Sequence, residues 1–175
     1  MPTTFTYFPS PVGELLLTAN ESAITGIYFP SRDRVPKDSA RWQEDTGQGS
    51  AGAVLAQARQ QLTEYFAGSR TSFELPLDPS GTGFQRRVWD ALRTIPYGTT
   101  TSYGVLAHRL GDPHATRAVG AANGQNPIPI VVPCHRVVGA DGSLRGFAWG
   151  LDLKRRLLAH EGSAALSLFA DATEH

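Results

Sequence analysis

This 175-residue chain contains a single cysteine, Cys134, and that one fact limits how its fold can be stabilised. One thiol forms no disulfide within the chain and cannot supply the several cysteines of a zinc site. The fold must therefore depend on a hydrophobic core, and a chain of this length can bury one large core or two small ones. Apolar residues at 41% and charged residues at 18% are typical of a globular protein.

The sequence favours neither a membrane protein nor a secreted one. It has no apolar run of about 18 residues, and its start, Met-Pro-Thr-Thr-Phe, lacks the basic residues and apolar core of a signal peptide. A lone cysteine also fits a reducing compartment. We expect a cytoplasmic protein that makes no membrane contact.

The first half of the chain has the pattern of a small sheet followed by one helix. Three short runs rich in Thr, Phe, Tyr and Ile are separated by turn signals and predict a β-meander. The runs are residues 3–8, 15–19 and 24–29. Residues 31–52 are polar and are predicted to form a loop. Apolar residues then recur at helical spacing from Val54 to Phe66, and Gly68 follows as a stop signal.

Residues 78–82, Asp-Pro-Ser-Gly-Thr, carry the strongest signal for a domain boundary. Residues 1–80 have 6 basic against 9 acidic residues, a net charge of −3, whereas residues 82–162 have 10 against 5, a net charge of +5. A basic half suits a polyanionic partner, and random scatter of charge explains the asymmetry equally well. We expect one domain over residues 1–79 and a second over 80–175.

The second half predicts several short helices. Thr82 and Gln85 have the spacing of a capping box and open an amphipathic helix. Ser102 can cap a second helix that Gly111 ends, and a third should cover residues 114–123. Two short helices joined by a Gly-containing turn are typical of a helix-turn-helix, although such pairs also occur in proteins that never bind DNA.

The segments around the cysteine and beyond it have their own signals. Residues 124–133 hold three prolines and are expected to be extended and rigid. An Asp-Gly turn within residues 137–147 predicts a β-hairpin. A last helix should end at Gly162, with Lys154-Arg155-Arg156 as its exposed face. Residues 163–175 show no pattern that indicates chemistry.

The residues after Cys134 leave two interpretations of this thiol open, and the first is a reactive nucleophile. His135 and Arg136 follow it directly, and cationic neighbours lower the pKa of a thiol, whose thiolate is the nucleophile. The alternative is a small buried hydrophobe, which describes most free cysteines. These neighbours alone do not decide between the two interpretations.

Five motifs come in an order that closely resembles the O6-alkylguanine-DNA alkyltransferases, which move an alkyl group from guanine irreversibly onto their own cysteine. The motifs are Ser102-Tyr103, Arg117-Ala-Val-Gly120, Asn126-Pro127, Pro133-Cys134-His135-Arg136 and His160-Glu161-Gly162. The resemblance is dense from about residue 84 to 162, whereas residues 1–80 match only in length and layout. It implies an α+β fold: a ribonuclease-H-like sheet-plus-helix domain, then a mainly helical winged helix-turn-helix domain carrying the cysteine.

The resemblance assigns catalytic roles to five residues. Cys134 is the nucleophile, and Glu161 orients His135, which withdraws the thiol proton through a bridging water. Tyr103 donates a hydrogen bond or proton to the displaced base. Asn126 ties the active-site segment to the helix-turn-helix.

The helix around Arg117 consists almost entirely of small residues. Such a helix can approach DNA closely while reading little sequence, which suits the minor groove of double-stranded DNA. Tight helix-helix packing is the alternative. By resemblance, Arg117 fills the gap that a flipped-out base leaves. The expected DNA contacts are Ala115, Thr116, Arg117, Ala118, Gly120 and Arg86, with Arg87, Arg93 and Arg109 as further phosphate contacts.

The substrate pocket should be formed by Phe147, Ala148, Trp149 and Val137. Trp149 stands where many family members have a small residue, and core packing is the alternative for it and for Phe147. Some members bind zinc in the first domain, but this chain has no cysteine before position 134. We expect a monomer with neither metal nor cofactor.

Two rival functions remain open. The first is a lesion-binding sensor of the alkyltransferase-like type, although such proteins lack the cysteine that this chain has. The second is an unrelated cysteine hydrolase that uses Cys134 and His135, for which a small-residue helix around Arg117 would have no purpose.

Overall fold

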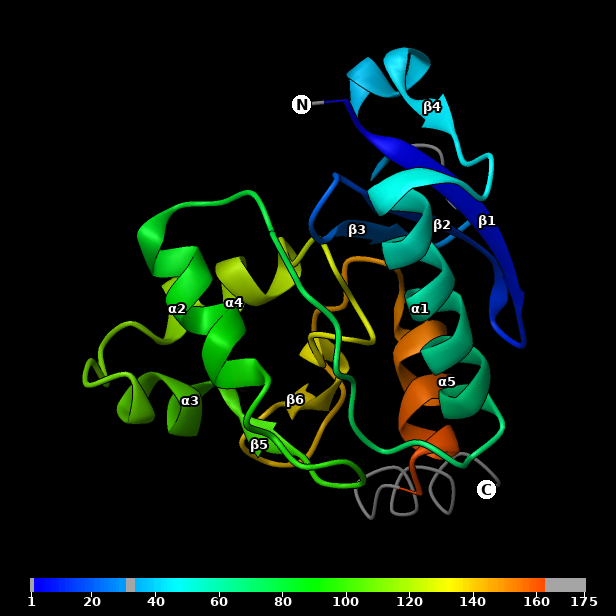
Figure 1. Cartoon of the computed structure of the whole chain (residues 1–175). Helices are drawn as coiled ribbons and strands as arrows, with labels where there is room; N and C mark the ends of the chain where they lie inside the picture. The colour runs from blue at the N-terminus through cyan, green and yellow to red at the C-terminus, as the bar shows by residue number, and fades with distance from the viewer. Residues whose placement is uncertain (1, 31–33, 163–175) are drawn as a thin grey trace. The chain divides into compact units, whose positions relative to one another are not determined.

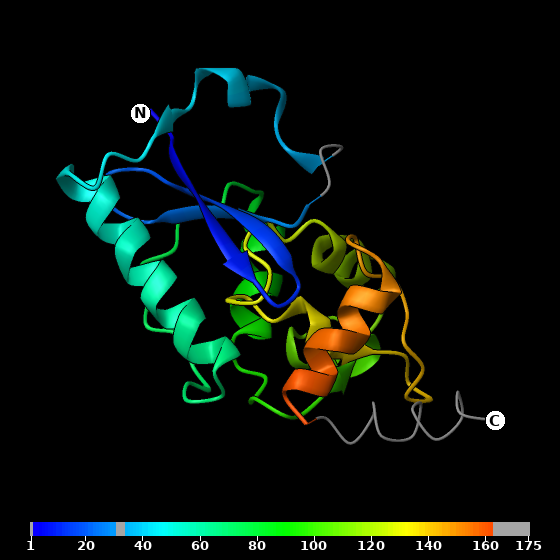
Figure 2. The ribbon, with the colours of Figure 1, turned by 90° about the vertical axis from the view of Figure 1, so that its right-hand side faces the viewer.

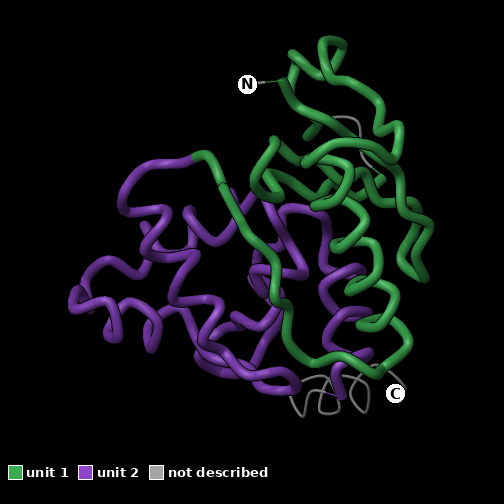
Figure 3. The backbone as a smooth tube through the Cα atoms, viewed as in Figure 1, with its two compact units in different colours: residues 1–80 green, residues 81–175 purple. Residues whose placement is uncertain are grey.

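The structure is a computed structural model that describes residues 2–30 and 34–162 (Figure 1). The chain divides into two compact units, residues 1–80 and residues 81–175 (Figure 3). Residues 31–33 of the predicted loop and the tail at 163–175 lie outside the described residues. Within the described part, no helix combines the length and the apolar character that a membrane span needs.

The first unit contains a four-stranded sheet with the strand order β3-β2-β1-β4. Its strands are β1 (Thr4–Ser10), β2 (Gly13–Ala19), β3 (Ile24–Tyr28) and β4 (Gln43–Glu44). The first three form the predicted antiparallel meander. β4 pairs in parallel with β1. The prediction of a loop over residues 31–52 was therefore incomplete, because this region also holds a 3-10 helix, η2 (Lys37–Arg41), and the start of α1. A two-residue strand that pairs with a distant one leaves no local signal.

Helix α1 (Gly49–Phe66) packs against one face of this sheet (Figure 2). Its buried stripe includes Leu55, Leu62 and Tyr65, at the predicted helical spacing. Gly68 has φ +82°, a left-handed conformation that glycine adopts easily, and the helix ends just before it. The helix begins earlier than predicted because its first turn is built of Gly, Ser and Ala, which show no apolar period.

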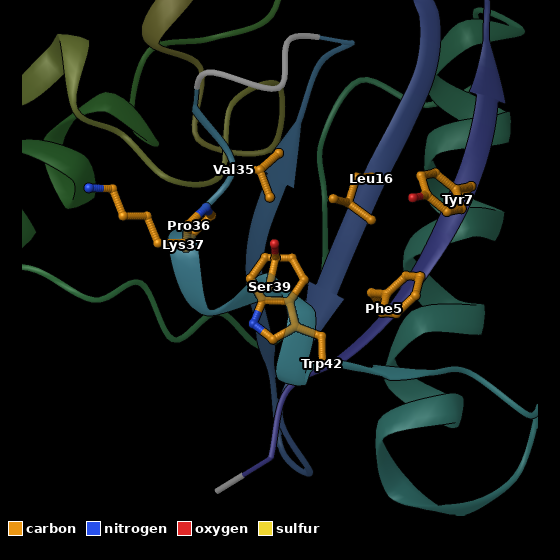
Figure 4. A pocket seen from close by; sticks show the side chains of 8 residues that line it. All are labelled: Phe5, Tyr7, Leu16, Val35, Pro36, Lys37, Ser39 and Trp42. Carbon is orange, nitrogen blue, oxygen red and sulfur yellow. The ribbon is translucent and has the colours of Figure 1, made fainter.

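The other face of the sheet carries a shallow pocket of about 430 Å³ (Figure 4). Side chains alternate along β1, so that Phe8 stacks on Phe66 of α1 while Tyr7 points to the opposite side. The pocket is lined by Phe5, Tyr7, Leu16, Val35, Pro36, Lys37, Ser39 and Trp42.

The second unit is mainly helical. Its helices are α2 (Gly83–Leu92), α3 (Tyr103–Arg109), α4 (Thr116–Gly124) and α5 (Leu151–His160). The predicted capping box forms: Thr82 Oγ1 accepts from Gln85 N at 3.1 Å, and Gln85 Oε1 accepts from Thr82 N at 2.9 Å. Ser102 caps α3 as predicted, accepting from Val105 N at 3.1 Å.

Helices α3 and α4 pack together as the helix-turn-helix pair, and α2 also packs against α4. Gly111, in the turn after α3, has φ +82°. Trp89 of α2 is buried and donates its indole Nε1–H to Ala122 O of α4 at 2.9 Å. Because the last carbonyls of a helix have no partner within the helix, this bond stabilises the end of α4.

The predicted β-hairpin over residues 137–147 was wrong. β6 (Val137–Val138) pairs in parallel with β5 (Thr101–Ser102), which lies far away in the sequence. The Asp-Gly turn does form, with Gly142 N donating to Gly139 O at 2.9 Å. No return strand follows it in the described chain, because side chains from α3 and α5 bond the backbone carbonyl of Arg145.

The prediction of an extended segment over residues 124–133 was also wrong. The chain makes tight turns there, and Val132 N donates to Ile128 O at 2.9 Å. Asn126 templates the turn: its Nδ2 donates to Val132 O at 2.8 Å, and its Oδ1 accepts from Ile128 N at 3.0 Å. Ile130 has φ +74°, which is rare for a β-branched residue. The prolines restrict the backbone dihedral angles, and the two hydrogen bonds of the Asn126 side chain stabilise the turn at this place.

Candidate active site

Cys134 lies at the start of a one-turn 3-10 helix, η3 (Cys134–Arg136), between the Asn126 turn and β6. It is only 4% exposed. Cys134 N donates to Val132 O at 2.8 Å, the same carbonyl that accepts from Asn126 Nδ2. Asn126 therefore shapes the segment that leads into the cysteine.

Burial raises the pKa of the Cys134 thiol to about 11, although the Asn126 side chain and the charge of Lys154 oppose this rise. The cationic neighbours therefore do not produce a low thiol pKa in this closed site. Desolvation outweighs the favourable contacts. The guanidinium of Arg136 is bound elsewhere, by Glu161 and by Ile95 O.

His135 and Arg136 both bind Glu161. His135 Nε2 lies 2.8 Å from Glu161 Oε2, and both side chains are fully buried. Arg136 Nε donates to Oε1 at 2.8 Å, and its Nη2 donates to Oε2 at 3.0 Å. Arg136 Nη1 donates to Ile95 O at 2.7 Å, which completes the set of bonds. One carboxylate thus holds both residues that follow the cysteine.

The charges of this network determine which nitrogen of His135 can act as a base. Burial alone would raise the pKa of Glu161, but the hydrogen bonds from His135 and Arg136 hold it well below its usual range. Burial lowers the pKa of His135, so the imidazole is neutral. An ionised carboxylate only accepts, so the ring proton sits on Nε2 and Nδ1 keeps a free lone pair. Among the described residues, Nδ1 has no hydrogen-bond partner.

Tyr103 and Lys154 meet at the loop that follows β6. The Tyr103 hydroxyl lies 3.1 Å from Arg145 O and 3.4 Å from Gly146 O. Lys154 Nζ donates to Val137 O at 2.5 Å and to Arg145 O at 2.7 Å, and it lies 5.9 Å from the centre of the Tyr103 ring. The tyrosine that should meet the substrate is thus bonded to the loop in this structure.

The prediction that Lys154-Arg155-Arg156 is an exposed face was wrong for Lys154, which is completely buried. Burial lowers its pKa to about 8, and the nearby Cys134 opposes this shift. The signal was present in the sequence, because position 154 precedes the buried Leu157 and Leu158 by three and four residues on the same helix face. The helical spacing was overlooked because a lysine is usually exposed.

Two more polar residues near Cys134 are buried, and the sequence did not predict their burial. Arg136 is 6% exposed and is bound as described above. Asn123 of α4 is 2% exposed, and its Nδ2 donates to the backbone carbonyl of Cys134 at 3.4 Å. Position 123 lies four residues after the buried Val119, so its place on the inner face of α4 follows from helical spacing.

Most of the predicted DNA-contact residues lie on the outer side of α4 or on α2. Thr116, Arg117, Ala118 and Arg86 are exposed, whereas Ala115 and Gly120 are half-buried. Arg93 and Arg109 are also exposed. Arg87 of α2 donates from Nη2 to Leu110 O at 3.1 Å, so this arginine also bonds the C-terminal end of α3.

The predicted pocket residues lie in two different surroundings. Phe147, Ala148 and Trp149 are half-buried and occupy the loop before α5, whereas Val137 is fully buried in β6. Their role in a substrate pocket stays a prediction. Within the described ranges, no three His, Cys, Asp or Glu side chains gather closely enough to hold a metal ion.

A helix-turn-helix domain whose lone cysteine precedes a buried imidazole–carboxylate pair defines a class of DNA-binding protein that reacts through a thiol. Two family profiles match this chain. The profile described as 6-O-methylguanine DNA methyltransferase, ribonuclease-like domain, matches residues 4–79. The profile described as 6-O-methylguanine DNA methyltransferase, DNA binding domain, matches residues 83–163.

Similar proteins give the same result. A methylated-DNA--protein-cysteine methyltransferase of Mycolicibacterium paratuberculosis is 49% identical over 91% of this chain and 94% of its own length. One from Methanosarcina acetivorans is 45% identical over 91% and 98%. The crystal structure of Mycobacterium tuberculosis O6-methylguanine methyltransferase has a TM-score of 0.81 at 44% identity, covering 95% of this chain and 99% of that one. This chain belongs to the 6-O-methylguanine DNA methyltransferase family.

Proposed function

We propose that this chain is a DNA repair protein that moves the alkyl group of O6-alkylguanine irreversibly to its own Cys134, once per molecule. The observation that supports this best is the free Nδ1 lone pair of His135, which Glu161 orients and which belongs to the residue that follows the only cysteine. The family membership supports a methylated-DNA-protein-cysteine methyltransferase, and a crystal structure of a relative, Mycobacterium tuberculosis OGT, is a complex with DNA.

The proposed reaction begins with removal of the thiol proton. A thiol with a pKa near 11 is almost entirely protonated at neutral pH, so it needs a base. His135 Nδ1 accepts the proton through a water, and Glu161 stabilises the imidazolium that forms. The Cys134 thiolate then attacks the alkyl carbon, a sulfur–carbon bond forms, and the bond from that carbon to O6 breaks with its electron pair remaining on the purine.

Tyr103 and Lys154 would act on the charge that leaves with the purine. A tyrosine hydroxyl can donate its proton to the displaced base, and Lys154 holds a positive charge close to both the ring of Tyr103 and Cys134. The hydroxyl must first exchange its contact with Arg145 O for one with the substrate. Entry of the base therefore requires that the loop carrying Arg145 move away from Tyr103.

DNA binding is assigned to α4 and the helix-turn-helix around it. Guanine is not accessible to a protein thiol inside the duplex, so the base must be extruded at a cost of a few kcal/mol. Arg117 is exposed on α4 among small residues, and its planar guanidinium can stack in the vacated space. We assign the approach to the minor groove, with a cytoplasmic monomer acting alone.

Transfer of label from methylated DNA tests this function against its two rivals. Duplex DNA carrying an isotopically labelled methyl group on guanine O6 should give one labelled group per chain and no further reaction. A lesion sensor would bind the DNA without taking up label. A hydrolase would leave the protein unlabelled and turn over a different substrate.

Replacing Lys154 should reduce reactivity much more than replacing the arginine beside it. In Lys154→Met the carbonyl of Val137 loses its charged donor, at a cost of about 1 to 3 kcal/mol, whereas Arg145 O keeps the hydroxyl of Tyr103 as a donor. The thiolate of Cys134 also loses a nearby cation, so transfer should slow. Arg155→Met is the matched control, because Arg155 is exposed on the same helix. Urea unfolding and single-turnover transfer rates measure both effects, and equal behaviour of the two variants would contradict the assignment.

Trp149→Gly should favour bulky alkyl groups. The indole is half-buried in the loop before α5, and added volume in a packed site costs about 1 to 3 kcal/mol unless neighbours move. The variant should therefore react faster with O6-benzylguanine relative to O6-methylguanine DNA, because a methyl group needs little room beside the sulfur. If the ratio of the two rates is unchanged or falls, Trp149 is core packing or a stacking surface.

A further inference from the structure

Two buried polar atoms beside Cys134 lack a hydrogen-bond partner among residues 2–30 and 34–162. They are His135 Nδ1 and Asn123 Oδ1. A buried polar atom without a partner is destabilising, so such atoms are usually satisfied by an ordered water or have a role in function. His135 is the residue after Cys134, and Asn123 hydrogen-bonds the backbone carbonyl of Cys134.

Asn123 contacts the peptide bond that joins the nucleophile to its base. Its Nδ2 donates to the carbonyl oxygen of Cys134 at 3.4 Å, and that carbonyl belongs to the peptide bond between Cys134 and His135. A carbonyl only accepts hydrogen bonds, so the NH₂ group must face it and Oδ1 must face away. The orientation of the amide is therefore determined, and Oδ1 is left as an acceptor.

The chemistry of these groups specifies what can satisfy them. His135 Nδ1 and Asn123 Oδ1 are both acceptors, and the Cys134 thiol is a donor. A water has two protons to donate and lone pairs to accept, so its hydrogen-bonding capacity matches these three groups. Buried waters in proteins typically make about three hydrogen bonds of this kind.

We propose that Asn123 is a positioning residue that holds the relay water between Cys134 and His135. This inference rests on the proposed role of His135 as the base. When Oδ1 accepts one proton of the water, the other points at His135 Nδ1 and a lone pair faces the thiol. The proton of Sγ–H passes to the water oxygen while the water passes its own proton to Nδ1. A thiolate and an imidazolium result, and the water is regenerated.

Asn123 also connects this relay to the helix assigned to DNA binding. It lies on the buried side of α4, six residues after the exposed Arg117. A shift of α4 on DNA therefore reaches the backbone of Cys134 through one side chain. The relay would be set in the correct geometry by the same helix that contacts the duplex.

A crystal structure of the unreacted protein tests the water directly. At a resolution that shows ordered waters, we expect one within hydrogen-bonding distance of Cys134 Sγ, His135 Nδ1 and Asn123 Oδ1. A water bound to the first two but not to Asn123, or no water at the site, overturns the inference. This measurement does not depend on whether a variant folds.

Asn123→Leu tests the role in the reaction. At neutral pH its single-turnover transfer rate on saturating O6-methylguanine duplex should fall about tenfold, because the base loses its oriented relay. The deficit should shrink as pH approaches the thiol pKa of about 11, where hydroxide can deprotonate the thiol directly. The dissociation constant for DNA should stay unchanged. Gln125→Leu, exposed at the end of α4, is the matched control and should behave as the wild type does.

The possible results separate the inference from the function beneath it. A wild-type rate in Asn123→Leu, a deficit that is constant with pH, or a defect confined to DNA affinity would each overturn the role of Asn123. Wild-type protein would still take up one methyl group in all three cases. If wild-type protein takes up none, the proposed function fails and the inference fails with it.

Discussion

Glu161→Gln should lower the free energy of unfolding by about 3 kcal/mol, because the buried guanidinium of Arg136 loses its counter-ion. Glutamine keeps the shape of the side chain, so the loss reports charge and hydrogen bonding more than packing. The partly exposed pair of Arg70 with Glu64 provides the control, and Glu64→Gln should change stability by less than about 1 kcal/mol. Urea unfolding followed by circular dichroism measures both variants.

The same substitution should slow alkyl transfer by at least about 10²-fold, because the orientation and charge of the base depend on that carboxylate. With glutamine at this position, His135 loses the ionised acceptor that fixes its tautomer and stabilises its charged form. A variant that is destabilised but reacts at the wild-type rate would show that Glu161 serves only the fold.

The pH dependence of stability should also distinguish the wild-type protein from Glu161→Gln. The folded pKa of Glu161 lies well below its ordinary value of 4.5, so between these two values the unfolded chain binds more protons than the folded one. Stability therefore rises with pH through this window and is lost on acidification below it. Wild-type protein should lose stability more steeply than Glu161→Gln as pH falls from about 5. Parallel slopes would mean that the carboxylate is not ionised in the folded protein.

Arg117→Ala should reduce repair of duplex DNA by roughly 10²-fold and leave the reaction with free O6-methylguanine base almost unchanged. Only the duplex requires extrusion of a base, so only there does a gap-filling side chain lower the barrier. Arg117 is exposed on α4, so its truncation removes no core packing.

Arg117→Lys is the informative companion to this variant. Lysine keeps the charge that attracts phosphate but lacks the planar group that can stack between bases. If Arg117→Lys repairs duplex DNA as slowly as Arg117→Ala does, stacking is the main contribution of the arginine. If lysine restores the rate, phosphate attraction is sufficient. A loss of equal size on the free base would instead show that Arg117 acts on the pocket or on the fold.

Local signals in the sequence predicted the helices and the meander. They could not predict pairing between strands that are far apart in the sequence. The capping box of Thr82 and the stop at Gly68 are contained within a few residues, so their chemistry can be recognised directly. The pairing of β5 with β6 joins two dipeptides that are far apart in sequence. The Asp-Gly signal correctly predicted a turn, but a turn requires a partner strand to become a hairpin, and Tyr103 and Lys154 bond that backbone instead.

The site was predictable where a motif or adjacency specifies it. Cys134 and His135 are neighbours, and the resemblance pointed to Glu161, whose carboxylate contacts the histidine. Lys154 and Asn123 were missed because both are polar side chains on buried helix faces, where the residue type contradicts the spacing. The raised thiol pKa was not predictable, because the sequence shows which residues are neighbours but not how far burial desolvates the thiol.

Intact-mass measurement after incubation with duplex DNA containing O6-methylguanine tests the central claim most directly. We expect the whole population to gain the mass of one methyl group in place of one hydrogen, with the group located on the peptide that contains Pro133 and Cys134. Cys134→Ser should gain nothing at neutral pH. A methyl group on any other residue, a second methyl group, or repeated turnover by one chain would contradict the account.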